Sequence, residues 1–124
     1  MQKLFLIGLA GFVGTLGRFA LSGYVARRFG ETFPTGTLVV NVVGCFFAGF
    51  VFYLAQERFM VGDTARTVIL IGLLGGFTTF SSFSLQTLNL MRDGELALAT
   101  VNVLASNLFC LLTLWAGDTL AKLL

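Results

Sequence analysis

The stretch GGFTTFSSFS, residues 75–84, combines poor helix formers and polar side chains in the middle of an apolar run of membrane length. Two adjacent glycines precede five hydroxyl residues, and Phe80 and Phe83 lie three residues apart, so a helix would put both rings on one face. Glycine destabilises a helix interior. One interpretation is a helix broken near Gly75 and Gly76, whose freed carbonyls bind a cation. The other is an intact helix whose glycines allow close packing.

Neutral polar side chains recur at helical spacing in two other apolar runs. Thr37 and Asn41 are four residues apart, so they share a helix face. Near the C-terminus the same spacing produces a polar stripe made of Asn102, Ser106, Cys110 and Thr113. Uncharged donors beside aromatic ring edges suit a small dehydrated anion, whereas a cation path would use carboxylates or ordered carbonyls. The alternative is that these polar side chains bond neighbouring helices and the phenylalanines only pack.

Other chemistries lack the residues they need. The chain has no histidine and no acidic pair within an apolar run, and intramembrane proton relays generally use Asp, Glu or His. Asp118 is the one acidic residue near an apolar run, and we expect it at the membrane interface. These features argue against an enzyme and against a proton-coupled exporter. Cys45 and Cys110 are expected to be reduced packing residues, because metal binding would need histidine or a second nearby thiol.

The distribution of charge predicts four membrane-spanning helices. Charged residues make up 11% of the 124, and the mean hydropathy is +0.91, which leaves too little charge to cover a soluble protein. Residues 32–56, 67–91 and 96–117 are free of charge, and each run exceeds the roughly 20 apolar residues that cross the hydrocarbon core. Residues 4–26 include Arg18, and their uncharged part is also compatible with a signal peptide. We expect one all-α membrane domain with helices at about 3–26, 37–56, 67–91 and 96–121.

Basic residues are nearly balanced between the two ends of such a bundle. Four spans put Lys3, Arg58, Arg66 and Lys122 on one side and Arg27, Arg28 and Arg92 on the other. Cytoplasmic loops normally carry the excess of Lys and Arg, so this balance indicates either a topology fixed by other factors or insertion in both orientations. In the second case, opposed subunits would form a dimer with a two-fold axis in the membrane plane.

Arg18 is a charged residue expected inside the first helix. Its long side chain would either snorkel or bond to helix ends, or it would supply positive potential to an aqueous vestibule that collects anions. The sequence does not favour one of these roles over the other.

The motifs GLLGGFTTFSSFS (residues 72–84) and PTGTLVVN (residues 34–41), with a glycine-rich first helix carrying Arg18, resemble the Fluc family of fluoride channels. The resemblance covers nearly the whole chain. It implies an antiparallel dual-topology homodimer in the bacterial inner membrane, with two fluoride pores each lined by both subunits. It also implies a third helix broken near mid-span and a central structural sodium ion. Fluoride, membrane lipid and a second copy of the chain are then the expected partners, and nucleic acid is not.

The resemblance also assigns residues, by motif position. The fluoride pore would be lined by Thr37, Asn41, Phe80, Ser82, Phe83 and Ser106. The backbone carbonyls of Gly75 and Thr78 would hold the sodium ion, and Arg18 matches the family pattern as a vestibule or structural residue. Two positions depart from some relatives: Cys110 stands where they have serine, which is a stronger donor than a thiol, and Asn102 stands where they have tyrosine.

The implied activity is passive export of cytoplasmic fluoride. Neutral hydrogen fluoride crosses membranes and dissociates in a near-neutral cytoplasm, and a channel then lets the negative-inside potential expel the anion. Two alternatives remain. A small multidrug exporter shares four helices and dual topology, but it relies on a glutamate in its first helix, where this chain has only Arg18 as a charge. A non-transporting assembly or regulatory protein would conduct nothing.

Overall fold

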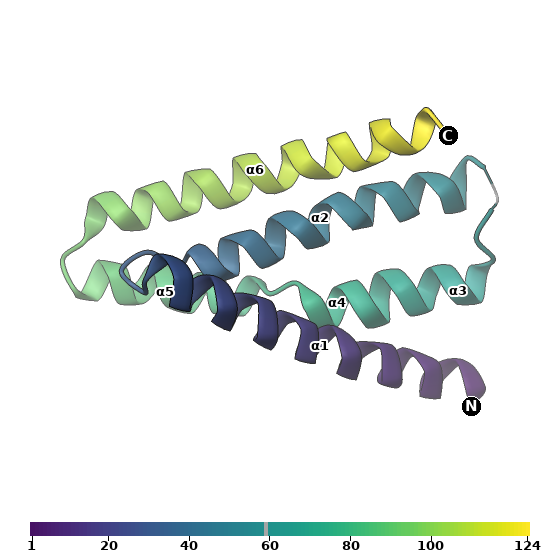
Figure 1. Ribbon diagram of the computed structural model, residues 1–124, viewed down its shortest axis with the longest axis horizontal. Helices are drawn as coiled ribbons and strands as arrows, with labels where there is room; N and C mark the ends of the chain where they lie inside the picture. Colours follow the sequence, from purple (N-terminus) through teal and green to yellow (C-terminus); the bar gives the residue numbers. More distant parts are fainter. Residues whose placement is uncertain (59) are drawn as a thin grey trace.

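A computed structural model describes residues 1–58 and 60–124 as a bundle of long helices, and this described part contains no strand. Figure 1 shows α1 (Gln2–Phe29), α2 (Thr35–Gln56) and α6 (Leu96–Lys122) as single rods. The remaining rod is composite, with α3 (Asp63–Thr67), the π-helical η1 (Val68–Leu73), α4 (Leu74–Phe77) and α5 (Phe80–Arg92) in succession. Four segments are long and apolar enough to cross a membrane, which confirms the all-α prediction of four spans.

The chain reverses direction at each connection, so its loops gather at two ends. The α1–α2 and α5–α6 connections lie at one end, and both termini lie at the other (Figure 1). As a result, α2 and α6 run parallel to each other, while α1 and the composite rod run the opposite way. At the end with the termini, Asp118 forms an ion pair of 2.6 Å with Lys122, consistent with the interfacial position expected for it.

Glycines allow the rods to approach closely. A Cβ atom on Gly14 would overlap the carbonyl oxygen of Leu73, where α1 meets the composite rod. A Cβ atom on Gly49 would likewise overlap the carbonyl oxygen of Leu114, where α2 meets α6. Small residues at such contacts bring helix backbones together, which is the main source of packing in a membrane. The relative positions of these helices are therefore tightly fixed.

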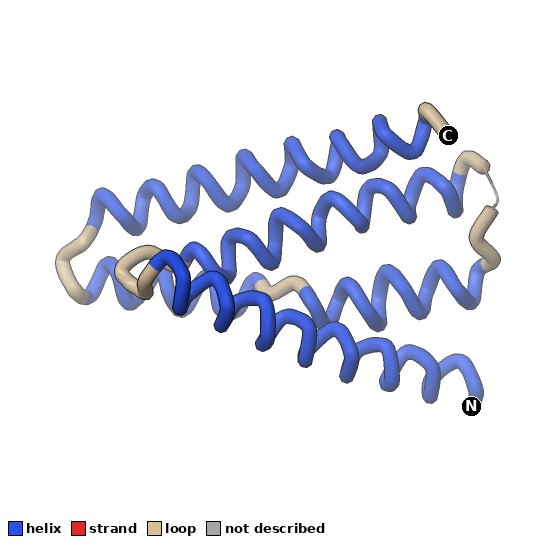
Figure 2. The backbone as a smooth tube through the Cα atoms, in the orientation of Figure 1, coloured by secondary structure: helices blue, strands red, loops and turns tan. Residues whose placement is uncertain are grey.

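The composite rod is interrupted by two extended residues. Thr78 has φ −81° and ψ 157°, and Thr79 has φ −152° and ψ 113°, so α4 ends at Phe77 and a new helix begins at Phe80. Figure 2 draws this interruption as a tan loop between two blue helices. Gly75 and Gly76 lie within α4 itself. The poor helix formers are therefore helical, and the β-branched residues after them adopt the extended backbone that such residues favour.

Candidate functional site

Asn41 on α2 clasps the interruption of the composite rod. Its Nδ2 donates to the Thr79 carbonyl at 3.0 Å, and the Thr79 N–H donates to its Oδ1 at 2.8 Å. A helix would normally satisfy both backbone groups, and leaving them unpaired in a bilayer costs several kcal/mol each. One amide side chain thus replaces two missing backbone partners. We use the term Asn41–Thr79 clasp for this pair of hydrogen bonds.

The threonines on either side of the interruption terminate their own helices. Thr78 Oγ1 and the Thr78 N–H both donate to the Leu74 carbonyl, each at 2.9 Å. Thr79 Oγ1 accepts from the Ser82 N–H at 3.1 Å, as an N-cap side chain does. The same hydroxyl donates to Ser82 Oγ at 3.0 Å. The Ser82 hydroxyl accepts that bond, so its own hydrogen remains available for another acceptor.

Arg18 also binds the end of α4. Its Nε donates to the Gly76 carbonyl at 3.2 Å, and Thr15 Oγ1 lies 3.5 Å from the same oxygen. Arg18 also lines the larger of two cavities described below. The structure thus shows the helix-end contact expected for Arg18 and places the residue beside a polar cavity.

Several backbone carbonyls near the interruption, including that of Phe77, accept none of the hydrogen bonds found in the described part of the chain. Within residues 1–58 and 60–124, the carbonyl oxygens of Gly75 and Thr78 accept no hydrogen bond. Gly75 is exposed and Thr78 is half-buried in the single chain. Unpaired carbonyls at mid-depth are tolerated in a membrane only when protein, water or an ion satisfies them. The chain's own hydrogen bonds therefore leave the Gly75 and Thr78 carbonyl oxygens free for another ligand.

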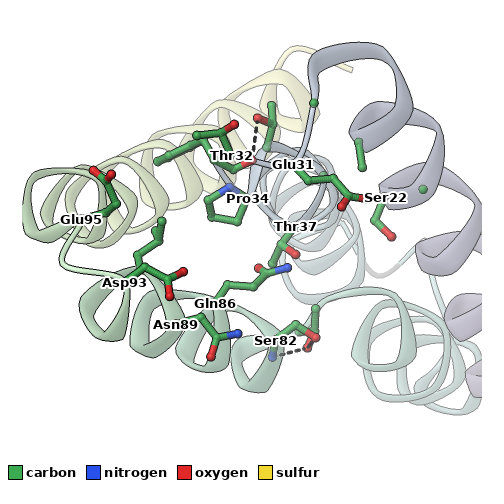
Figure 3. Close-up of a pocket in the computed structure, with 18 of the residues that line it drawn as sticks. Ser22, Glu31, Thr32, Pro34, Thr37, Ser82, Gln86, Asn89, Asp93 and Glu95 are labelled. Atoms are coloured by element: carbon green, nitrogen blue, oxygen red, sulfur yellow. Dashed lines mark hydrogen bonds between the residues drawn. The ribbon is translucent and has the colours of Figure 1, made fainter.

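The first cavity has a volume of about 670 Å³ and opens beside the α1–α2 and α5–α6 loops. Figure 3 shows Thr37, Ser82 and Gln86 along this cavity, with Asp93 and Glu95 from the α5–α6 connection. Most of the labelled side chains are polar. The cavity is thus a hydrophilic recess that penetrates from one end of the bundle toward the interruption.

Sequence reasoning missed two residues of α5 on the first cavity. Gln86 and Asn89 line it together with Ser82, and the spacing of four and seven residues puts all three on one helix face. The Gln86 Oε1 atom is buried and has no hydrogen-bond partner in the described part of the chain. The sequence did contain the signal: Ser82, Gln86 and Asn89 form a second polar stripe, which begins in GGFTTFSSFS and continues directly after it.

The second cavity has a volume of about 380 Å³ and lies on the other side of the Asn41–Thr79 clasp. Its lining includes the side chains of Asn41, Phe80, Phe83 and Ser106, together with Gly75 and Thr78. Thr79 borders both cavities. The fold therefore distributes the sequence-predicted residues over two adjoining recesses, with Arg18, Thr37 and Ser82 on the first and the others on the second.

The two phenylalanines of the motif contact each other but differ in environment. Their ring centroids are 5.2 Å apart, with the planes tilted by 47°. Phe83 is 8% exposed, whereas Phe80 is 76% exposed in the single chain. The Phe83 ring is therefore a buried part of the cavity wall, whereas the Phe80 ring stands at the exposed edge of the cavity.

The polar stripe of α6 divides into two kinds of residue. Asn102 is 2% exposed, touches neither cavity and donates to Thr87 Oγ1 at 2.8 Å. Thr113 Oγ1 donates to the Phe109 carbonyl of its own helix at 2.8 Å, and the Val42 carbonyl of α2 lies 3.1 Å from the same hydroxyl. Ser106 and Cys110 line the second cavity, although the Ser106 hydroxyl also points to Asn102 Oδ1 at 3.4 Å. Helix packing thus accounts for half of the stripe, and the cavity for the other half.

Comparison with known proteins identifies the family of this chain. Residues 5–118 match the family described as CrcB-like protein, Camphor Resistance (CrcB). The chain belongs to the CrcB-like family. It is therefore an integral membrane protein, in agreement with its four membrane-length segments.

Individual CrcB-like relatives are similar over nearly their whole length. A protein of Opitutus terrae is 54% identical over 98% of this chain and 93% of its own length. Relatives from Methylocella silvestris (52% identical, 93% and 89% covered) and Citrifermentans bemidjiense (44% identical, both chains fully covered) are comparably close. All three are named fluoride-specific ion channel FluC, so their named activity is ion conduction and not enzymatic catalysis.

Removing the Asn41–Thr79 clasp is expected to destabilise the protein. Asn41→Leu leaves the Thr79 N–H and carbonyl unpaired, and each orphaned group costs about 1–3 kcal/mol, so the loss is about 2–6 kcal/mol. The measurement is thermal unfolding of the purified protein in detergent. Asn107→Leu is the matched control, because Asn107 is exposed and bonds only within its own helix, to Val103. Equal midpoints for the two variants would show that the clasp carries no stability.

Proposed function

We propose that this CrcB-like chain forms a fluoride-selective channel through which cytoplasmic fluoride leaves the cell passively. The observation that carries the proposal is the pair of recesses that adjoin at Thr79, with uncharged donors and an aromatic pair along the second. The names of the relatives support fluoride as the ion. Hydrogen fluoride enters cells as the neutral weak acid and dissociates inside, which traps fluoride. A channel would let the membrane potential expel this trapped anion.

The hydrogen-bond directions suit an anion. Asn41 uses one hydrogen of its Nδ2 group for Thr79, and an amide NH₂ has two. The Ser82 hydroxyl accepts from Thr79 and keeps its own hydrogen. Phe80 and Phe83 both line the second cavity, and the edge of an aromatic ring carries partial positive charge. We infer that an ion moves from the first cavity, past Thr37 and Ser82, to Asn41, the two rings and Ser106 in the second.

We further propose that the working unit is an antiparallel dual-topology homodimer with two pores. Phe80 and Gly75 are exposed in the single chain although they border the second cavity, so a wall of that cavity is missing. A second copy would supply it. The near balance of basic residues between the two ends is compatible with opposed insertion of the two copies.

A structural sodium ion on the dimer axis would satisfy the unpaired carbonyls. The carbonyl oxygens of Gly75 and Thr78 accept no hydrogen bond in the described part of the chain, and oxygen ligands suit a small hard cation. Two copies would present four such oxygens around one ion. When bound, the ion would hold the two interruptions together, while the chain's own Asn41–Thr79 clasp orients each of them.

Replacing one ring of the aromatic pair by an aliphatic side chain is expected to slow fluoride flux. Phe80→Ile removes the aromatic contact with Phe83, worth about 1 kcal/mol, and a barrier raised by that amount gives a roughly fivefold slower rate. Phe5→Ile is the matched control, because Phe5 is exposed near the N-terminus and lines neither cavity. The readout is fluoride efflux from proteoliposomes, with dimer assembly checked by size-exclusion chromatography. Normal flux in Phe80→Ile would remove this ring from the pore.

Dual topology predicts that each terminus is found on both sides of the membrane. A protease-cleavable tag after Leu124 should be cut in about half of the copies when protease is added outside spheroplasts. The remainder should be cut only after the membrane is opened. Cleavage of all copies, or of none, from one side would contradict opposed insertion.

The proposed sodium ion predicts cation-dependent stability. Replacing sodium chloride by N-methylglucamine chloride at equal ionic strength should lower the unfolding midpoint, since a ligand at about 100 times its Kd stabilises by about 2.7 kcal/mol. Potassium chloride serves as the control for ion size. A midpoint that is the same in all three salts would contradict a sodium site at Gly75 and Thr78.

A further inference from the structure

The fold brings together two thiols that the sequence suggested were separate packing residues. Cys45 on α2 and Cys110 on α6 are both reduced and half-buried, and both line the second cavity. Helices α2 and α6 touch one turn further along, because a Cβ atom on Gly49, four residues after Cys45, would overlap the carbonyl oxygen of Leu114, four residues after Cys110. The second nearby thiol that a sulfur-based metal site requires is therefore present.

The thiol pair forms the next layer of the second cavity beyond two of its polar residues. Cys45 follows Asn41 by four residues, and Cys110 follows Ser106 by four residues. This spacing keeps each cysteine on the helix face of its predecessor, one turn further along. Because α2 and α6 run parallel, both cysteines are displaced in the same direction. Anything bound between the two sulfur atoms would occupy the cavity beside Phe80 and Phe83.

Helix packing holds the thiol pair in place. The Thr113 hydroxyl lies 3.1 Å from the Val42 carbonyl on one side of the pair. On the other side Gly49 packs against the Leu114 carbonyl, with no room for a Cβ atom. These contacts hold α2 on both sides of Cys45, and they hold α6 on the side that follows Cys110. A site that is already assembled loses little conformational entropy on binding.

We propose that Cys45 and Cys110 form a two-thiolate site for the mercuric ion, and that its occupation blocks the second cavity. Thiolates are soft ligands that prefer soft metal ions. Each thiol loses its proton on binding, so two Cys–SH groups and one Hg²⁺ give Cys–S–Hg–S–Cys and two protons, with no change in oxidation state. The product is neutral. Ag⁺ or Cu⁺ would leave a net negative charge in a low-dielectric region, which is costly.

The site itself is tested on purified protein, without any transport measurement. Mercuric chloride is titrated while the ultraviolet sulfur-to-mercury absorption and the remaining reactive thiols are followed. We expect both thiols to disappear with one mercuric ion per chain, and the metal to survive a monothiol wash that strips C45S and C110S. Two ions per chain, or equal loss from the wild type and the single variants, would overturn the site. If a serine variant does not assemble, the alanine variant replaces it.

The blocking effect rests on the proposed channel function and is tested separately by fluoride efflux. Each protein is compared with its own untreated rate. We expect mercuric chloride to abolish flux in the wild type and to leave C45S/C110S, which has no thiol, at its untreated rate. Undiminished wild-type flux with the metal retained would overturn the block. If untreated protein conducts no fluoride, the channel proposal and the block fail, while the thiol titration still decides the metal site.

Discussion

A bilayer offers no water to backbone groups, so each N–H and carbonyl needs a hydrogen-bond partner within the protein. At the interruption of the composite rod, one side chain supplies two of these partners. Asn41 satisfies both the N–H and the carbonyl of Thr79, and Arg18 satisfies the Gly76 carbonyl nearby. These contacts allow two extended residues to persist at mid-depth. The interruption in turn separates α4 from α5 and leaves a recess on each side of Thr79. The geometry of the candidate site therefore follows from how this stretch of backbone is satisfied.

Polar side chains in this bundle serve two purposes that the structure separates. Asn102 bonds Thr87 of α5, and the Thr113 hydroxyl lies between the Phe109 carbonyl of its own helix and the Val42 carbonyl of α2; neither residue lines a cavity, so both contribute to helix packing. Asn41 does both, because its amide holds Thr79 and also borders the second cavity. Such a shared role ties the stability of the helix bundle to the composition of the proposed anion route. The same tight α2–α6 contact also assembles Cys45 and Cys110 into a pair.

The sequence predicted the spans well, because runs without charge are a direct consequence of the hydrocarbon core. It did not locate the interruption, since Gly75 and Gly76 are both helical, with Gly76 packed against α1, and the extended residues are Thr78 and Thr79. The motif positions singled out residues that do line the two recesses. Their roles in conduction stay predictions. The pairing of Cys45 with Cys110 depends on the packing of two distant helices, and spacing along the chain does not encode it.

The proposed function depends on an uncharged, donor-lined route that passes fluoride. The most direct measurement is ion efflux from liposomes that contain the purified protein, with fluoride and chloride followed in parallel. Rapid fluoride loss without chloride loss is the predicted result, and it would make the recesses on either side of Thr79 parts of one pore. Retention of both ions by correctly assembled protein would contradict the account, and GGFTTFSSFS would then be a packing motif.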